Sequence, residues 1–336
     1  MKLTTSSDFS EESLQFARQL GVTHLKVDAG KLMDEHQRGP VQLPKLLEQK
    51  KRIESYGLKI GVALLPQGAE SQHWNIRLGR PEREQEIEDV CRSIEILGKE
   101  GIPVVEYVFN LAALGADAPS TLCSSFSKAC VSGSESKPYG RGGAIVRHFD
   151  YERARKAPPE PGFKAGAEDV WERITYFLER VVPVAETASV KLACHPDDPP
   201  VSTLKGETRV LGSMEGMKRL IEIVPSDANC LNFCQGTVAE MGVDVIEAIR
   251  YFGSRGRIQH VHFRNVKGSV PRFDESFIDD GDVDMLQALR TYKEVGYTGT
   301  IMPDHWPRVV GDSPLIGEAH ALGYLKALME ALDVLE

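Results

Sequence analysis

The order of apolar segments predicts an α/β protein, and within that class a (β/α)8 TIM barrel. Eight short aliphatic runs alternate with amphipathic segments along the 336 residues. Continuous alternation of this kind requires parallel strands joined by right-handed crossovers, and eight such units suit a chain of this length. A doubly wound sheet is the competing architecture. It favours a glycine-rich turn after the first strand, and residues 2–7 contain no glycine.

Each predicted strand is short and rich in aliphatic residues. The eight strands are Lys2–Thr4, His24–Val27, Lys59–Leu64, Pro103–Val108, Val190–Ala193, Asn229–Phe233, Ile258–Phe263 and Gly299–Met302. Apolar residues at helical spacing predict the helices Ser10–Leu20, Arg83–Gly101, Trp171–Thr187, Met214–Ile223, Asp244–Phe252, Asp284–Val295 and Ile316–Leu335. The first helix has Ser10 as its N-cap, and the second has Ile87, Val90, Ile94 and Leu97 on one face.

Residues 1–336 are therefore expected to form a single barrel domain with one long insertion. Residues 111–161 follow the fourth strand, look irregular and are rich in Ser, Ala, Gly and Lys. A long loop at this place lies over the barrel mouth, where it can act as a lid or bind substrate. A mobile insertion, or one that contacts another subunit, fits the same composition.

The bulk composition favours a cytoplasmic enzyme that acts on a small molecule. The net charge of −9 argues against nucleic acid as the main partner. No apolar run approaches the roughly 18–20 residues that cross a bilayer, and residues 1–12 do not resemble a signal peptide, so we expect no membrane partner. The six cysteines form no CxxC pair and are expected to be reduced. These features are also compatible with a homo-oligomer.

The segment Cys194-His195-Pro196-Asp197-Asp198-Pro199-Pro200 follows a predicted buried strand. Its three prolines exclude a helix and fix the backbone of a polar turn. The carboxyl ends of parallel strands are where α/β enzymes place catalytic groups. The alternative is a surface turn whose aspartates only cap the next helix.

Three later strands also end in residues that ligate metals. His195 follows the fifth strand, Cys234 the sixth, His262 ends the seventh, and Asp304 follows the eighth. Strand alternation places His260, His262 and Arg264 on one face, with His262 nearer the mouth. Each residue alone has a plain alternative: a core cysteine, a satisfied buried histidine or a capping aspartate. Four such residues at successive strand ends predict one metal site, for which His262 is a better ligand than His260.

The ligand types indicate which metal this site would hold. Two imidazoles, one thiolate and one carboxylate suit a divalent transition ion. If all four residues bind, the metal needs a coordination number of five or six to leave room for substrate. This favours Mn²⁺, Fe²⁺ or Co²⁺ over a closed tetrahedral zinc site.

At this point the chain resembles the mannonate dehydratase family, a branch of the xylose-isomerase-like barrels. The likeness covers most of the chain and is carried by residues 75–79 with Pro81 and Arg83, and by residues 140–144, 194–200, 232–236, 262–264, 273–285 and 303–305. It implies dehydration of D-mannonate to 2-keto-3-deoxy-D-gluconate with Mn²⁺ or Fe²⁺. It also implies His195, Cys234, His262 and Asp304 as ligands and His305 as a catalytic residue.

One departure from the family pattern bears on the substrate. Family members carry His-Gly after the aspartate and then a longer loop that ends in a Gly-Tyr element with a catalytic tyrosine. Here Trp306-Pro307 follows His305, and the loop to Ile316 is short. Ser313 falls near the position of that tyrosine, and Tyr324 lies within the final helix. The resemblance therefore supports the fold and the metal site more directly than it supports D-mannonate as the substrate.

Dehydration requires a proton taken from C2 and a hydroxyl expelled from C3, so we expect His305 to act as the acid/base group beside the metal. Arg264, or Arg141 from the insertion, is expected to bind the substrate carboxylate, with a structural salt bridge as the alternative. A metal-dependent isomerase or epimerase of a sugar or sugar acid is the second candidate function. A nucleic-acid phosphodiesterase and a non-enzymatic binding protein suit the acidic charge and the ligand set less well.

Overall fold

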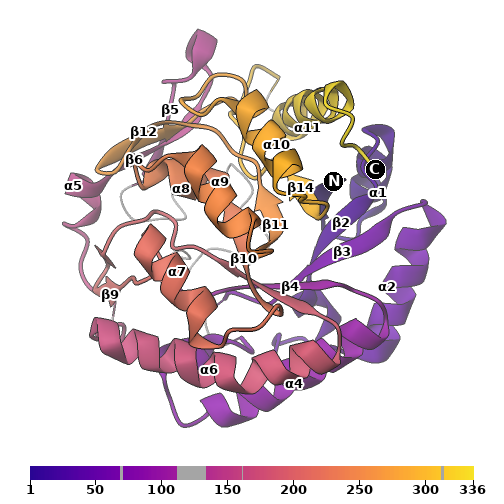
Figure 1. Cartoon of the computed structure of the whole chain (residues 1–336), viewed down its shortest axis with the longest axis vertical. Helices are drawn as coiled ribbons and strands as arrows, with labels where there is room; N and C mark the ends of the chain where they lie inside the picture. The colour runs from indigo at the N-terminus through magenta and orange to yellow at the C-terminus, as the bar shows by residue number, and fades with distance from the viewer. Residues whose placement is uncertain (69–70, 112–133, 161, 312–313) are drawn as a thin grey trace.

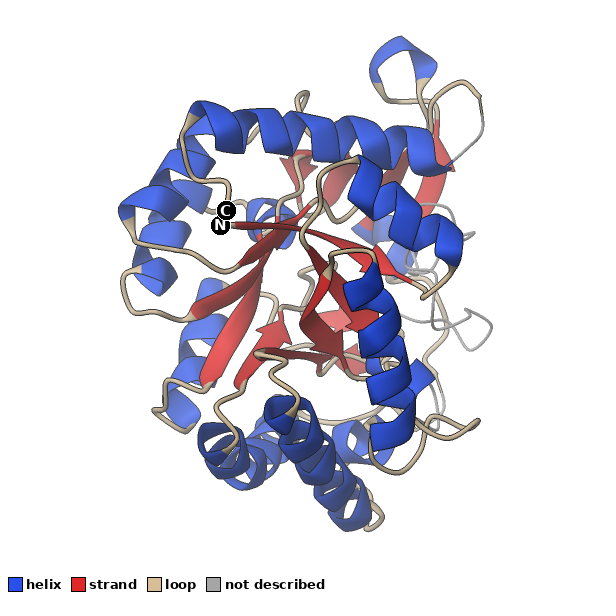
Figure 2. Cartoon of the chain, turned by 90° about the vertical axis from the view of Figure 1, so that its right-hand side faces the viewer, coloured by secondary structure: helices blue, strands red, loops and turns tan. Residues whose placement is uncertain are grey.

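The computed structural model describes residues 1–68, 71–111, 134–160, 162–311 and 314–336, and it confirms the barrel. Eight parallel strands close in the order β1-β14-β11-β10-β7-β4-β3-β2, with the helices outside them (Figures 1 and 2). These strands are β1 (Lys2–Ser7), β2 (His24–Asp28), β3 (Lys59–Leu64), β4 (Val104–Val108), β7 (Lys191–His195), β10 (Asn229–Cys234), β11 (Ile258–His262) and β14 (Thr300–Met302).

All seven predicted helices are present, with ends that differ by a few residues. They are α1 (Glu11–Gln19), α4 (Arg83–Lys99), α6 (Ala167–Thr187), α7 (Met214–Ile223), α9 (Val245–Gly253), α10 (Met285–Glu294) and α11 (Pro314–Ala331). Further helices that the sequence analysis did not predict are α2 (Leu43–Ser55), α3 (Trp74–Leu78), α5 (Tyr151–Ala154) and α8 (Gln235–Glu240), with short 3₁₀ turns at η1 (Ala29–Leu32) and η2 (Arg141–Gly143).

The helices bury one apolar face against the outside of the barrel. In α4 the predicted stripe Ile87, Val90, Ile94 and Leu97 is buried, as its spacing requires. Helix α1 begins where predicted, because the Ser10 side chain accepts a hydrogen bond from the backbone N–H of Ser13. Burial of these stripes in one continuous core fixes the barrel that carries the site.

The prediction that residues 111–161 are irregular is wrong for the part that the structure describes. Strands β5 (Ser134–Lys137) and β6 (Val146–Asp150) join β12 (Val266–Ser269) and β13 (Arg272–Glu275) in an antiparallel sheet of order β12-β13-β6-β5, beside the barrel in Figure 1. A separate hairpin, β8 (Thr203–Leu204) with β9 (Glu207–Thr208), follows β7. Residues 112–133 lie outside the described residues, so the predicted lid is untested there.

The barrel interior is polar near its carboxyl end. Parallel pairing matches Asn232 with His260 and Cys234 with His262, so these side chains point to the same side of the sheet. The interior of most TIM barrels is filled by branched aliphatic residues. Buried ionisable groups here, such as Glu106 and His262, therefore mark the carboxyl end as the place for chemistry.

The two ends of the chain lie side by side, and the amino group of Met1 donates a hydrogen bond of 2.6 Å to the carbonyl of Val334 (Figure 1). Among the described residues, none of the helices combines the length and the apolar character needed to span a bilayer.

Candidate metal centre

The structure brings the four predicted ligands together at the carboxyl end of the barrel. His195, Cys234, His262 and Asp304 each offer one ligand atom, and these four atoms lie within 4.8 Å of one another. A transition cation with ligand distances of about 2.0–2.3 Å holds opposite ligands about 4.6 Å apart or less. The side chains come from β7, β10, β11 and the segment after β14, which are neighbours in the closed barrel.

His262 presents a nitrogen atom that suits a cation. Its Nδ1 lies 3.4 Å from Oδ1 of Asp304 and is buried without a hydrogen-bond partner. Its Nε2 lies 3.1 Å from Nδ2 of Asn232, whose Oδ1 is also buried without a partner. Exchanging the two ends of this amide lets Oδ1 accept the Nε2 proton, which leaves the Nδ1 lone pair for a metal. Burial and the nearby Lys26 lower the pKa of His262 well below its ordinary value, so the ring is neutral.

His195 is oriented in a similar way by the backbone. Its Nδ1 lies 2.7 Å from the carbonyl oxygen of Pro196, within the predicted rigid turn. Because that carbonyl accepts the Nδ1 proton, Nε2 is the ring atom that can bind a metal.

The other two ligand atoms are a thiol and a carboxylate. The Sγ atom of Cys234 lies 3.9 Å from Oδ2 of Asp304. Burial raises the pKa of Cys234 to about 12, so only a cation bound directly to the sulfur would favour its thiolate. Burial alone would raise the pKa of Asp304, but His305 and Arg264 hold it well below its ordinary value. The residues present therefore fit a divalent transition cation.

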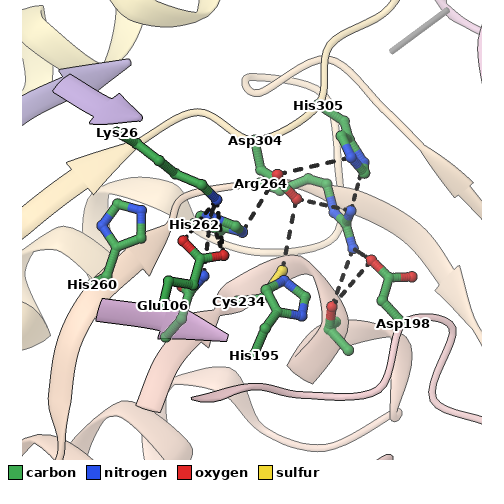
Figure 3. Close-up of polar contacts among 12 residues, drawn as sticks. Lys26, Glu106, His195, Asp198, Cys234, His260, His262, Arg264, Asp304 and His305 are labelled. Atoms are coloured by element: carbon green, nitrogen blue, oxygen red, sulfur yellow. Dashed lines mark hydrogen bonds and ion pairs between the residues drawn. The ribbon is translucent and has the colours of Figure 1, made fainter. Parts of the chain in front are cut away.

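Arg264 lies at the centre of a buried network of carboxylates (Figure 3). Its side chain is 0% exposed, and Nη2 lies 2.8 Å from Asp198 and 2.7 Å from Glu240. Its Nη1 lies 3.1 Å from Asp304 and 3.5 Å from Glu275. A substrate carboxylate would have to displace one of these partners.

Gly236 provides the space for this arginine. A Cβ atom at residue 236 would lie 2.2 Å from Nε of Arg264, so any larger residue would collide with the guanidinium stem. The three carboxylates of Asp198, Glu240 and Glu275 form a cluster that could itself hold a metal, but the guanidinium lies among them. Arg264 therefore occupies the position that a second cation would need.

His305 lies between this network and the proposed ligands. Its Nδ1 lies 2.9 Å from Oε2 of Glu275 and 2.6 Å from Nη1 of Arg264, while its Nε2 lies 3.8 Å from Oδ1 of Asp304. Burial would lower the pKa of His305, but Asp304 and Glu275 outweigh it and raise the pKa to about 9. The small sheet contributes to this arrangement, because Arg147 of β6 pairs with Glu275 of β13.

The two aspartates of the rigid turn have different partners. Oδ2 of Asp197 accepts a hydrogen bond of 2.7 Å from the backbone N–H of Leu211. Asp198 binds Arg264, so it belongs to the site network and does more than cap a helix.

Two charged residues of the interior were missed by the sequence analysis. Lys26 on β2 and Glu106 on β4 form an ion pair in which Nζ lies 2.8 Å from each carboxylate oxygen. Nζ also lies 3.0 Å from Nε2 of His262 (Figure 3). The sequence does contain an indication of this pair, because each of the two charged residues lies between apolar residues of a predicted strand.

The remaining candidates lie away from the four ligand atoms or outside the described residues. Arg141 forms an exposed salt bridge of 2.9 Å with Asp279, which ties the insertion to the acidic segment before α10. The phenol of Tyr324 is half-buried on α11, and its electrostatic neighbours are Asp279 and Asp284. Ser313 lies outside the described residues.

Comparisons with known proteins identify the family of this chain. The family model "D-mannonate dehydratase (UxuA)" matches residues 163–336. A mannonate dehydratase of Thermotoga petrophila is 31% identical over 324 residues, which cover 87% of this chain and 86% of that protein. A second relative, mannonate dehydratase 2 of Halalkalibacterium halodurans, is 31% identical over 311 residues, covering 86% of this chain and 87% of that protein.

Solved structures show the same likeness. The crystal structure of mannonate dehydratase from Streptococcus suis has a TM-score of 0.82 and 25% identity, and the match covers 100% of this chain and 95% of that one. A 3-keto-D-glucoside 4-epimerase from E. coli has a TM-score of 0.61 at 13% identity, covering 97% of this chain and 99% of that one, and it shares the fold alone. The chain thus belongs to the mannonate dehydratase family, whose members are hydro-lyases.

Proposed function

We propose that this protein dehydrates D-mannonate to 2-keto-3-deoxy-D-gluconate with the help of a bound divalent transition cation, Mn²⁺ or Fe²⁺. The observation that carries the proposal is the meeting of four ligand atoms within 4.8 Å beside a buried imidazole. Membership of a hydro-lyase family supports the reaction type.

In this proposal His195, Cys234, His262 and Asp304 hold the cation. His262 binds through Nδ1 and His195 through Nε2, because the other nitrogen of each ring faces Asn232 or the carbonyl of Pro196. When bound, such a cation would act as a Lewis acid toward the carboxylate and the adjacent hydroxyl of a sugar acid.

His305 is the proposed acid/base group. Its Nδ1 is engaged by Glu275 and Arg264, so Nε2 is the atom that exchanges a proton with the substrate. The reaction requires one proton to leave C2 and one to join the departing C3 hydroxyl, and an imidazole can take part in either transfer. This nitrogen lies 3.8 Å from Oδ1 of Asp304, which supports its role beside the proposed cation.

Arg264 is proposed as a positioning residue. It holds the carboxylate of Asp304 and shares the carboxylate of Glu275 with the ring of His305. It is itself held by Asp198 and Glu240. In this role it fixes the angle between a ligand and the acid/base group without touching the substrate.

A product assay over several sugar acids tests the proposal. Metal-loaded protein is incubated with D-mannonate and with a panel of other aldonic acids, and 2-keto-3-deoxy acids are detected in each reaction. We expect product from D-mannonate at the highest rate. Recovery of an epimerised acid or sugar, with D-mannonate unchanged, would show that the alternative function of isomerase or epimerase is correct.

A further inference from the structure

The barrel interior beside the proposed ligands contains a buried ion pair that the dehydration scheme does not use. The Lys26 ammonium lies 2.8 Å from both oxygens of Glu106, and the two side chains are 11% and 1% exposed. Moving two charges out of water costs several kcal/mol per ion, and well-packed apolar residues of similar volume are often at least as stable. Fold stability therefore does not explain why charges occupy these two positions.

The hydrogen-bond donors of Lys26 can be counted. An ammonium group has three donors and no acceptor. Among the described residues, Nζ donates a hydrogen bond to Oε1 of Glu106 and lies 3.0 Å from Nε2 of His262. Oε2 of Glu106 lies 2.8 Å from Nζ but is buried without a hydrogen-bond partner. If His262 binds a cation through Nδ1, its Nε2 carries a hydrogen and cannot accept one from Lys26. At least one donor of Lys26 then has no hydrogen-bond partner within this group.

The position of Lys26 indicates what that donor can reach. Its ammonium lies beside a proposed ligand, and its side chain is more exposed than that of Glu106 or His262. Lys26 and His305 lie on opposite sides of Asp304 in Figure 3. The ammonium and the imidazole therefore lie on different sides of this proposed ligand (Figure 3).

We propose that Lys26 binds the substrate by donating a charge-assisted hydrogen bond to the carboxylate of the sugar acid. This inference rests on the proposed function, since it takes the substrate to be a sugar acid held at the cation. It assigns to Lys26 the role that the sequence analysis gave to Arg264, whose guanidinium is engaged by Asp198, Glu240 and Asp304. Removal of the C2 proton increases the negative charge on the carboxylate, so a fixed ammonium also favours that step.

A paired substitution separates substrate binding from structural support. The single change Lys26→Met leaves Glu106 as a buried unpaired charge, so the protein can lose stability for that reason alone. The double variant Lys26→Met with Glu106→Gln replaces both charges by neutral side chains of similar size. Glu106→Gln alone keeps the ammonium. The control Lys59→Met makes the same lysine change at the exposed amino-terminal end of β3 and is expected to leave activity unchanged.

Three measurements are made on each variant: thermal unfolding, bound metal by elemental analysis, and kcat/KM for D-mannonate. Affinity for D-mannonate is measured by calorimetry in an added His305→Asn background, so that turnover does not interfere. We expect the double variant to fold and to bind a full equivalent of metal. Its kcat/KM should fall about 100-fold, and its affinity should fall at least about tenfold. Glu106→Gln alone should reduce both kcat/KM and the affinity for D-mannonate by less than the double variant does.

Two results would overturn the assignment of Lys26. One is a double variant that keeps kcat/KM and affinity within threefold of the parent. The other is a double variant that loses its metal, which would show that the pair acts through His262. If the parent itself forms no 2-keto-3-deoxy acid, the proposed function fails, and the calorimetric affinities for D-mannonate still show whether Lys26 binds a sugar acid.

Discussion

Nδ1 of His262 lies 3.4 Å from Oδ1 of Asp304 and is buried without a hydrogen-bond partner. Buried polar atoms in folded proteins are almost always satisfied, so an unpaired ring nitrogen facing a carboxylate needs an explanation. A cation between the two atoms provides one, because each then binds the metal. This relationship underlies the predictions for the metal site.

Cys234→Ser should remove most of the bound metal. A serine hydroxyl is a much weaker ligand than a thiolate for a transition cation, and the buried site offers no substitute. Elemental analysis after gel filtration measures the loss. Cys230→Ser is the matched control, since Cys230 is a buried cysteine of the same strand outside the ligand cluster, and it should keep its metal. Full occupancy in the Cys234 variant would assign that cysteine to the core.

Asn232→Ala should weaken metal binding by about 10- to 100-fold, as loss of a hydrogen bond to a ligating histidine usually does. In the proposed site, the amide oxygen of Asn232 accepts the Nε2 proton and so fixes the tautomer of His262. Competition with a metal-binding dye measures the affinity. An Asn232→Asp variant, whose carboxylate can still accept the Nε2 proton, should bind more tightly than the alanine variant. Equal affinities for all three proteins would contradict this role.

His305→Asn should lower kcat by about 10²- to 10⁴-fold while the metal content is unchanged. The imidazole exchanges protons in the proposed reaction, and the asparagine amide does not. Steady-state kinetics and elemental analysis on the same sample test both parts. His320→Asn makes the same change on the half-exposed face of α11 and should have no effect on kcat. An active His305 variant would remove the acid/base role.

Arg264→Met should destabilise the protein by roughly 3–5 kcal/mol, because it leaves Asp198, Glu240 and Glu275 facing one another without their shared cation. Urea unfolding measures the free energy. Arg272→Met, which breaks an exposed pair with Asp150, should leave stability nearly unchanged. If both variants unfold at the same urea concentration as the parent, the network does not contribute to stability.

Glu318→Gln should change how stability depends on pH. Burial raises the pKa of Glu318 to about 7, and the Thr5 hydroxyl that donates to it only partly opposes this. The folded state therefore binds more protons than the unfolded state between about pH 4.5 and 7, and stability falls as pH rises through this window. The glutamine side chain stays neutral and can still accept from Thr5.

The test compares urea unfolding of the parent and the Glu318 variant at pH 5 and pH 8. The variant should be more stable than the parent at pH 8, by roughly 1–3 kcal/mol, with little difference at pH 5. Glu330→Gln on the exposed side of α11 serves as the control. An equal shift at both pH values would show that Glu318 is not the group responsible.

The barrel and the clustering of the four candidate ligands were predictable because they depend on local patterns. Aliphatic runs mark the strands, and the carboxyl ends of parallel strands meet at one end of a barrel, so His195, Cys234 and Asp304 had to approach one another. Alternation puts His260 and His262 on the same face, and His262 was preferred because it lies nearer the barrel mouth. The ring of His260 instead lies with Nδ1 2.7 Å from the Thr300 hydroxyl.

The parts that were missed depend on contacts between distant residues. Strand β6 pairs with β13, so Arg147 meets Glu275 across 128 positions of sequence, and no local pattern predicts that pairing. The same applies to Arg264, whose carboxylate partners come from four separate segments. Helix α2 has only Leu46 and Ile53 buried within its thirteen residues, which gives a weak periodic signal.

Anomalous X-ray diffraction from crystals grown with Mn²⁺ tests the central claim most directly. The account predicts one strong peak within about 2.0–2.4 Å of Nε2 of His195, Sγ of Cys234, Nδ1 of His262 and a carboxylate oxygen of Asp304. A peak at another position, or no peak while these four side chains contact only one another, would contradict it.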